Sequence, residues 1–132
     1  MRLYLDSSAI VKLVQAESES SALRRYLRRH RADDKVTSEL ARVEVVRAVL
    51  PGGADALGKA RRQLARVHHV SLSRDLLDVA ATLAPESLLR SLDAIHVASA
   101  RMLGGDLRAL VTYDGRMADA ARALGVETAS PS

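Results

Sequence analysis

The chain has 132 residues, of which 48% are hydrophobic, and a formal net charge of +4. These values predict a single domain, residues 1–132, and exclude a disordered chain, while the absence of Cys excludes disulfide frameworks, thiol catalysis and Cys-ligated zinc. No apolar stretch approaches the ~18 residues of a membrane span, and Asp6 interrupts the apolar run that a signal peptide needs, so we expect no membrane association and a cytoplasmic location.

Short apolar runs alternate with amphipathic segments from the N-terminus onward. The first part of the chain predicts, in order, a strand at residues 2–5, helices at 7–14 and 17–29, a strand at 35–37 and a helix at 38–50. Ser7 or Ser8 would cap the first of these helices, and Ser38 the third. The second helix ends in arginines, which the helix dipole favours there.

Pro51-Gly52-Gly53 separates two helices and is too short to be a domain linker. The second part predicts, in order, a helix at 55–67, a strand at 69–72, helices at 73–84 and 87–103, a strand at 109–112, a helix at 115–124 and a strand at 126–128. Strands that alternate with helices indicate an α/β fold. We expect a three-layer α/β/α sandwich with a short central parallel sheet.

The basic residues are mostly arginine, since only Lys12, Lys35 and Lys59 are lysines. Arg suits bidentate contacts with phosphate, so the composition favours a polyanionic partner such as nucleic acid. A merely solvated surface, with Arg in place of Lys, accounts for the same composition. The basic stretch 47–67 either lines the path of a substrate or forms a variable helical hairpin.

Four acidic residues lie next to segments that should be core: Asp6, Glu44, Asp93 and Asp114. Burying a carboxylate is costly unless a cation is shared with it. Asp6 and Asp114 each follow a predicted strand, and open parallel sheets bind ligands outside the carboxyl ends of their strands. We therefore expect these two side chains to meet if their strands are neighbours.

Glu44 and Asp93 belong to predicted apolar helices. Glu39 competes with Glu44, but it lies roughly 140° away around the helix, in a first turn where an acid suits the dipole. Asp93 is equally explained as a first-turn acid, and Asp6 and Asp114, each alone, as loop acids. The prediction of a site depends on all four together.

Carboxylates and water are ligands that suit Mg²⁺ or Mn²⁺, which orient a water and stabilise charge on a phosphoryl group. Ser7, Ser8 and Thr112 would hydrogen-bond the acids, and His96 is either a core histidine or a partner of Asp93. A phosphatase with two acids one residue apart is excluded by Ser8. No Gly-rich phosphate loop occurs. Zinc is not expected at residues 68–69, because adjacent strand residues point to opposite faces.

Four segments of the sequence resemble those of the PIN-domain ribonucleases and, more narrowly, the VapC toxins of bacterial toxin–antitoxin systems. They are residues 4–9 (YLDSSA), 38–44 (SELARVE), 92–100 (LDAIHVASA) and 111–114 (VTYD). The resemblance implies a Mg²⁺-dependent endoribonuclease, with Mn²⁺ as a substitute. The acidic metal-site residues it implies are Asp6, Glu44, Asp93 and Asp114, and the supporting residues are Ser8 and Thr112.

The resemblance also implies a homodimer that a VapB-like antitoxin silences in a heterotetramer or larger complex, with a basic antitoxin side chain in the acidic site. Two alternatives stay open: a non-catalytic RNA-binding module of this fold, and a PIN nuclease outside any toxin–antitoxin pair. Low aromatic content disfavours the first. A receiver-type signalling domain would need a Lys after a late strand, where Tyr113 and Asp114 stand.

Overall fold

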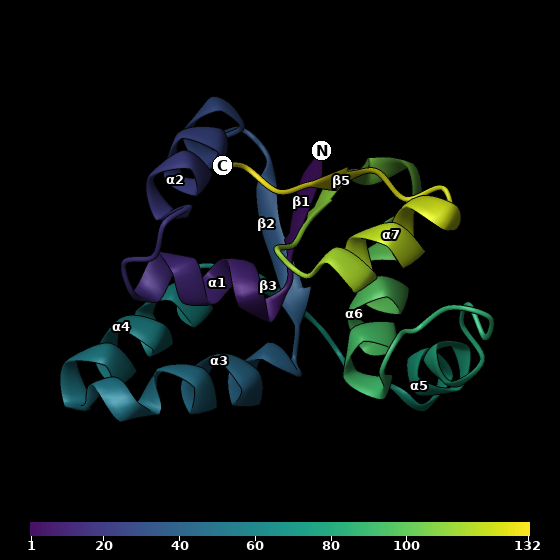
Figure 1. Cartoon of the computed structure of the whole chain (residues 1–132), viewed down its shortest axis with the longest axis horizontal. Coiled ribbons are helices and arrows are strands. Elements are labelled where there is room, and N and C mark those ends of the chain that lie inside the picture. Colours follow the sequence, from purple (N-terminus) through teal and green to yellow (C-terminus); the bar gives the residue numbers. More distant parts are fainter.

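Five short parallel strands form the centre of the computed structural model, which describes all 132 residues (Figure 1). They are β1 (Arg2–Leu5), β2 (Asp34–Ser38), β3 (His68–Val70), β4 (Leu107–Val111) and β5 (Thr128–Ala129). Their order in the sheet is β3-β2-β1-β4-β5, and every neighbouring pair is parallel. The sheet therefore grows outward from β1 in both directions, and the carboxyl ends of β1 and β4 lie at the point where the winding reverses.

Helices cover both faces of this sheet (Figure 1). On one face are α1 (Ser7–Val14), α2 (Ser20–Arg29), α3 (Ala41–Val49) and α4 (Ala54–Ala65), and on the other are α5 (Arg74–Ala81), α6 (Ser91–Arg101) and α7 (Gly115–Ala123). Short 3₁₀ turns occupy Leu50–Gly52 and Gly104–Asp106. The predicted α/β/α sandwich with a parallel sheet is confirmed. None of the helices combines the length and the apolar character that crossing a bilayer requires.

The central strand β1 contributes to a core on each side of the sheet, because successive strand residues point to opposite faces. Leu3 and Leu5 pack in the cluster that contains Val45 of α3, whereas Tyr4 packs in the cluster with Val97 of α6. All of these side chains are fully buried. Burial of each such aliphatic side chain stabilises the fold by about 1.5–3 kcal/mol, so the edge that follows β1 is held rigidly from both sides.

Several element boundaries and caps differ from the sequence prediction, and those at the starts of α1 and α3 have local reasons. Neither Ser7 nor Ser8 caps α1; the cap is Asp6, whose carboxylate accepts the Ala9 amide at 3.0 Å. Ser38 ends β2, and its hydroxyl accepts the Leu40 amide across a turn, so α3 begins only at Ala41.

The helix expected at 73–84 ends at Ala81, and the helix expected at 87–103 runs from Ser91 to Arg101. Pro85 explains the break, because a proline restricts the residue before it and excludes the helical conformation there. Ala84 has φ 46°, outside the right-handed helical region. The connection between α5 and α6 therefore leads directly to the start of α6, where Arg90 and Asp93 lie.

Candidate functional site

Asp6 is the buried centre of a polar cluster at the carboxyl edge of the sheet. Its side chain is 2% exposed and accepts three hydrogen bonds. They come from the Thr112 hydroxyl at 2.5 Å, the Ser8 hydroxyl at 2.7 Å and the Ala9 amide at 3.0 Å. Burial raises the pKa of Asp6, although the hydrogen bonds from Thr112 and Ser8 oppose that shift. A buried carboxylate of this kind is best stabilised in its charged form by a nearby cation.

Asp114 is tied to Asp6 through Thr112. The Thr112 hydroxyl that donates to Asp6 accepts the Asp114 amide at 3.0 Å. Asp114 itself caps α7, where it accepts the Arg116 and Met117 amides. Because β1 and β4 pair in the sheet, the residues that follow them meet at one edge, as the sequence predicts for neighbouring strands.

Glu44 and the buried His96 form a second cluster, which joins α3 to α6. His96 Nε2 lies 2.7 Å from Glu44 Oε1, and the Ser7 hydroxyl donates to the same oxygen at 2.7 Å. Burial works against ionisation of Glu44, but the hydrogen bonds from His96 and Ser7 prevail and lower the pKa of Glu44. Glu44 is therefore an ionised carboxylate at neutral pH.

The tautomer of His96 follows from its two neighbours. The hydroxyl of Tyr4 lies 2.8 Å from His96 Nδ1, and burial raises the pKa of Tyr4, so the phenol keeps its proton and donates it. Nδ1 then accepts, and Nε2 carries the proton that it donates to Glu44. Ser7, which contacts Glu44, directly follows Asp6 in the chain, and Ser8, the next residue, contacts Asp6. The second cluster therefore lies beside Asp6.

Arg90 places a cation between the remaining two carboxylates. Its Nε lies 3.3 Å from Asp93 Oδ2, and its Nη2 lies 3.7 Å from Asp114 Oδ2. The Arg90 side chain is 70% exposed, whereas that of Asp93 is 12% exposed. Both contacts are long, so this exposed arginine neutralises two acids of different elements through weak contacts.

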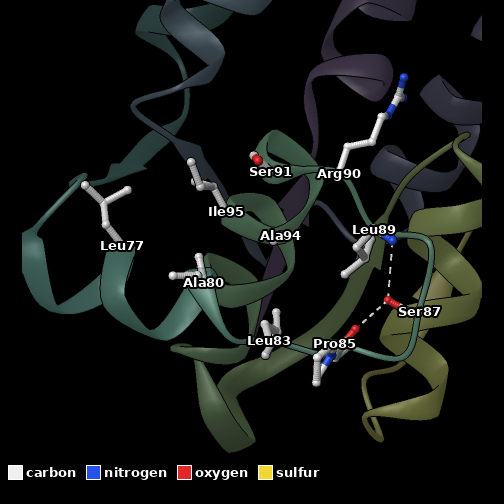
Figure 2. Close-up of a pocket in the computed structure, with 12 residues that line it drawn as sticks. Leu77, Ala80, Leu83, Pro85, Ser87, Leu89, Arg90, Ser91, Ala94 and Ile95 are labelled. Carbon is white, nitrogen blue, oxygen red and sulfur yellow. Dashed lines mark hydrogen bonds between the residues drawn. The ribbon is translucent and has the colours of Figure 1, made fainter.

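Arg90 also marks the border of an apolar hollow. A cavity of about 360 Å³ lies between α5 and α6, and mostly apolar side chains line it. Figure 2 shows Leu77, Leu83, Leu89 and Ile95 around this hollow, while the Arg90 side chain extends away from it. Leu89, the residue before Arg90, lines this hollow, so an apolar surface borders the acidic edge of the sheet.

The structure arranges the four predicted acids as a connected group. Thr112 joins Asp6 to Asp114, Arg90 joins Asp114 to Asp93, and Glu44 is held beside Asp6 by Ser7. No three acidic or histidine side chains lie close enough together to hold a metal ion in this arrangement. The donor set nevertheless fits a divalent cation, because it consists of carboxylates, one of them buried, and a guanidinium already lies between two of the others.

The structure places Glu44 rather than Glu39 in the polar cluster, and it adds two contacts that the sequence did not predict. Glu39 contacts Arg42 at 3.8 Å on the surface, with 42% of its side chain exposed, so it takes no part in the cluster. His96 does not pair with Asp93, one of the two roles expected for it, but is a buried partner of Glu44. Arg90 went unnoticed, although its place three residues before Asp93 is the signal that could have found it.

Comparison with known proteins places the chain in a family. The model of the PIN domain matches residues 3–123. The chain belongs to the PIN-domain family.

Within that family it belongs to the VapC-type toxins. It is 53% identical over 131 residues to ribonuclease VapC46 of Mycobacterium tuberculosis, with 98% of each chain covered. Its fold matches VapC20 of M. tuberculosis, a toxin that cleaves the sarcin–ricin loop, with a TM-score of 0.76 at 20% identity, over 98% of this chain and 99% of that one. It also matches VapBC2 of Rickettsia felis, solved with a DNA fragment from their promoter, with a TM-score of 0.72 at 13% identity over 100% of both chains.

Proposed function

We propose that this chain is a Mg²⁺-dependent endoribonuclease and the toxin of a VapBC-like toxin–antitoxin pair, and that residues 1–132 act as one nuclease domain in the cytoplasm. The observation that carries the proposal is the buried Asp6 carboxylate, joined through Thr112 to Asp114 at the carboxyl edge of the sheet. The 53% identity to ribonuclease VapC46 supports hydrolysis of RNA as the reaction.

The carboxylates of Asp6, Glu44, Asp93 and Asp114 are the groups that would hold Mg²⁺, or Mn²⁺ in its place. When bound, such an ion supplies activation of a water molecule and neutralisation of charge on the phosphodiester. The protein's own contribution is to hold its carboxylates ready. Two hydroxyls and one amide fix the oxygens of Asp6, and the hydrogen bonds to Glu44 keep that side chain ionised.

Arg90 has a role on the substrate side in this proposal. Its exposed guanidinium lies at the acidic edge and can move from Asp93 and Asp114 to a phosphate oxygen of RNA, for which it has suitable geometry. That exchange would free the two carboxylates for the ion as the substrate arrives.

The proposed partner that silences the enzyme is a VapB-like antitoxin, bound to a toxin homodimer in a heterotetramer or a larger complex. The match to the VapBC2 structure of R. felis supports an antitoxin as the partner. A basic antitoxin side chain would take the place between Asp93 and Asp114 that Arg90 occupies here, since a guanidinium bridges those two acids.

Cleavage of RNA by the purified chain, with Mg²⁺ and with chelator, tests the nuclease. Asp6→Asn and Asp93→Asn should each abolish cleavage, whereas Glu39→Gln, an acid of the same region that faces solvent, should leave it intact. Cleavage that survives both Asn variants and the chelator would contradict the proposal. Intact RNA in Mg²⁺ and Mn²⁺, despite tight binding, would favour a non-catalytic RNA-binding module.

Expression in a bacterial host tests the toxin role separately. The wild-type chain should arrest growth, Asp6→Asn should not, and co-expression of a small adjacent open reading frame should relieve the arrest. A folded, RNA-cleaving chain that leaves growth unaffected would instead indicate a PIN nuclease outside any toxin–antitoxin pair.

A further inference from the structure

A group of basic side chains lies away from the acidic edge, where the proposed reaction makes no use of it. Two adjoining hollows, of about 230 and 210 Å³, share Leu13, Arg24, Gln63 and Arg66 in their linings. We call them together the α2–α4 groove. Its cations are Arg24 and Arg28 on α2, Lys35 on β2, and Lys59, Arg62 and Arg66 on and just after α4.

The cations of the α2–α4 groove are not neutralised by the protein. No acidic residue lines either hollow, and none of the six side chains takes part in an ion pair. Arg24 donates only to the Leu13 carbonyl, at 3.4 Å. By contrast Lys12, at the same end of α1, contacts both Glu17 and Glu19. The groove therefore keeps a concentrated positive charge that a bound anion would neutralise.

The spacing of these residues along the helices brings like charges together. Arg24 and Arg28 are four residues apart, and Lys59, Arg62 and Arg66 follow at intervals of three and four, so each set lies on one face of its helix. Like charges at such intervals destabilise a helix, and two helices direct them into the same groove. Repulsion between these cations destabilises the folded chain, and a bound ligand that carries several negative charges in a row would relieve that repulsion.

We propose that the α2–α4 groove binds the phosphate backbone of the RNA substrate at a distance from the cleaved bond. The inference rests on the proposed ribonuclease function. The apolar residues of the lining are buried or half-buried, five of the six cations are exposed, and no aromatic side chain is present. A ligand therefore meets charge rather than apolar or stacking surface, which suits a sugar–phosphate backbone read without regard to base sequence.

The groove and the acidic edge lie at opposite ends of α1. Asp6 caps the start of this helix, whereas Leu13 and Val14 at its end border the groove, with α2 and α4 on either side (Figure 1). Eight helical residues span about 12 Å at ~1.5 Å per residue. An RNA longer than a few nucleotides can contact both places at once. The groove should therefore set the affinity for RNA and leave the chemical step unchanged.

The test compares two multiple variants with matched loss of charge. The groove variant removes three cations of the groove by the substitutions Arg24→Gln, Arg62→Gln and Arg66→Gln. The control variant removes three exposed arginines that line neither hollow, by the substitutions Arg25→Gln, Arg74→Gln and Arg101→Gln. Each set is combined with Asp6→Asn, and binding of a labelled RNA oligonucleotide is measured against salt. Binding does not require cleavage, so the result is independent of whether the chain is a nuclease.

The groove variant should bind RNA on the order of tenfold more weakly or worse. The slope of its log binding constant against log salt concentration should become shallower by about two, at roughly 0.7 per lost phosphate contact with a single strand. On the same Asp6→Asn background, the control set should lose much less RNA affinity. With Asp6 restored, the groove variant should raise KM for RNA cleavage at unchanged kcat. If proteins with Asp6 restored leave RNA intact while the groove substitutions still weaken RNA binding, the nuclease proposal fails and the proposed role of the groove in RNA binding is supported.

Equal RNA affinities of the groove and control variants would overturn the inference, even where cleavage proceeds. The same holds if the groove variant loses affinity for poly-L-glutamate and retains its affinity for RNA, because the groove would then accept an acidic protein segment. Thermal unfolding of the groove variant should occur no lower than that of the wild type, since the substitutions relieve repulsion. Weakened binding is then not a result of misfolding.

Discussion

Replacement of the buried Asp6 by Asn should stabilise the metal-free protein at neutral pH while abolishing its activity. The Asn side chain is nearly the same size, and its oxygen can accept from Ser8 and Ala9 as the Asp6 oxygen does. Its amide group would face Thr112, whose hydroxyl oxygen accepts one hydrogen bond from Asp114 and has a second lone pair free. The network can therefore reverse this one bond, although the Thr112 hydroxyl proton then loses its acceptor.

The expected magnitude follows from two opposing contributions. Hydrogen bonds to a charged group stabilise by about 1.5–3 kcal/mol and neutral ones by about 0.5–1.5, so Asn loses about 2–3 kcal/mol over the two hydroxyl contacts. The burial of an ion costs several kcal/mol. The net effect is a stabilisation of about 1–3 kcal/mol, which corresponds to a rise in Tm on the order of 5–10 °C for a domain of this size.

The pH dependence separates the loss of charge from a change in packing. Because burial raises the folded-state pKa of Asp6 above its unfolded value, the folded state holds the proton more tightly. Wild-type stability therefore falls as pH rises from the ordinary carboxyl pKa through the folded-state value, and the penalty is complete above it. The advantage of Asp6→Asn should be largest at high pH and vanish as pH falls toward the ordinary carboxyl range.

Urea unfolding of both proteins in chelator, across this range of pH, is the measurement, with the exposed Glu39→Gln as control. Added Mg²⁺ should stabilise the wild type more than Asp6→Asn, because a ligand stabilises the state that binds it. A variant that is less stable than the wild type at every pH would refute the reasoning, since the carboxylate would then be a net source of stability.

Three further predictions concern the surroundings of the acids. Arg90→Gln should raise the affinity for Mg²⁺ several-fold in calorimetry, because it removes a competing cation, and change stability by less than about 0.5 kcal/mol at this exposed position; unchanged Mg²⁺ affinity would contradict that competition. His96→Ala should destabilise by about 2–4 kcal/mol in urea unfolding, since it removes the partner of the Tyr4 hydroxyl and one of the two partners of Glu44, and opens a cavity; a loss below 1 kcal/mol would count against the buried network. Leu110→Ala, in the fully buried centre of β4, should cost about 2–5 kcal/mol in the same assay, and a smaller cost would indicate a loosely packed core.

The sequence predicted the order and type of the elements well, because their signals are local. The apolar runs that became β1 and β4 are brief and end in polar residues, and their carboxyl ends were correctly expected to carry Asp6 and Asp114. The caps were less predictable. Three candidates for the first one, Asp6, Ser7 and Ser8, stand side by side, and the choice depends on backbone angles that only the junction of strand and helix sets.

By itself, the sequence determined that this is an α/β protein of the PIN-domain family with four acids next to core segments. Hydrophobic periodicity and short motifs carry that information, and both are properties of neighbouring residues. Only the tertiary structure decided which side chains meet. His96 and Glu44 are 52 positions apart in the chain, and Ser8 reaches the Tyr113 amide across 105.

The cations of the α2–α4 groove are likewise brought together from α2, β2 and α4. The physical reason is common to these cases. A side chain's partner across the fold depends on how whole helices pack against a shared sheet, and that packing is a sum over the entire core. No window of the sequence contains it.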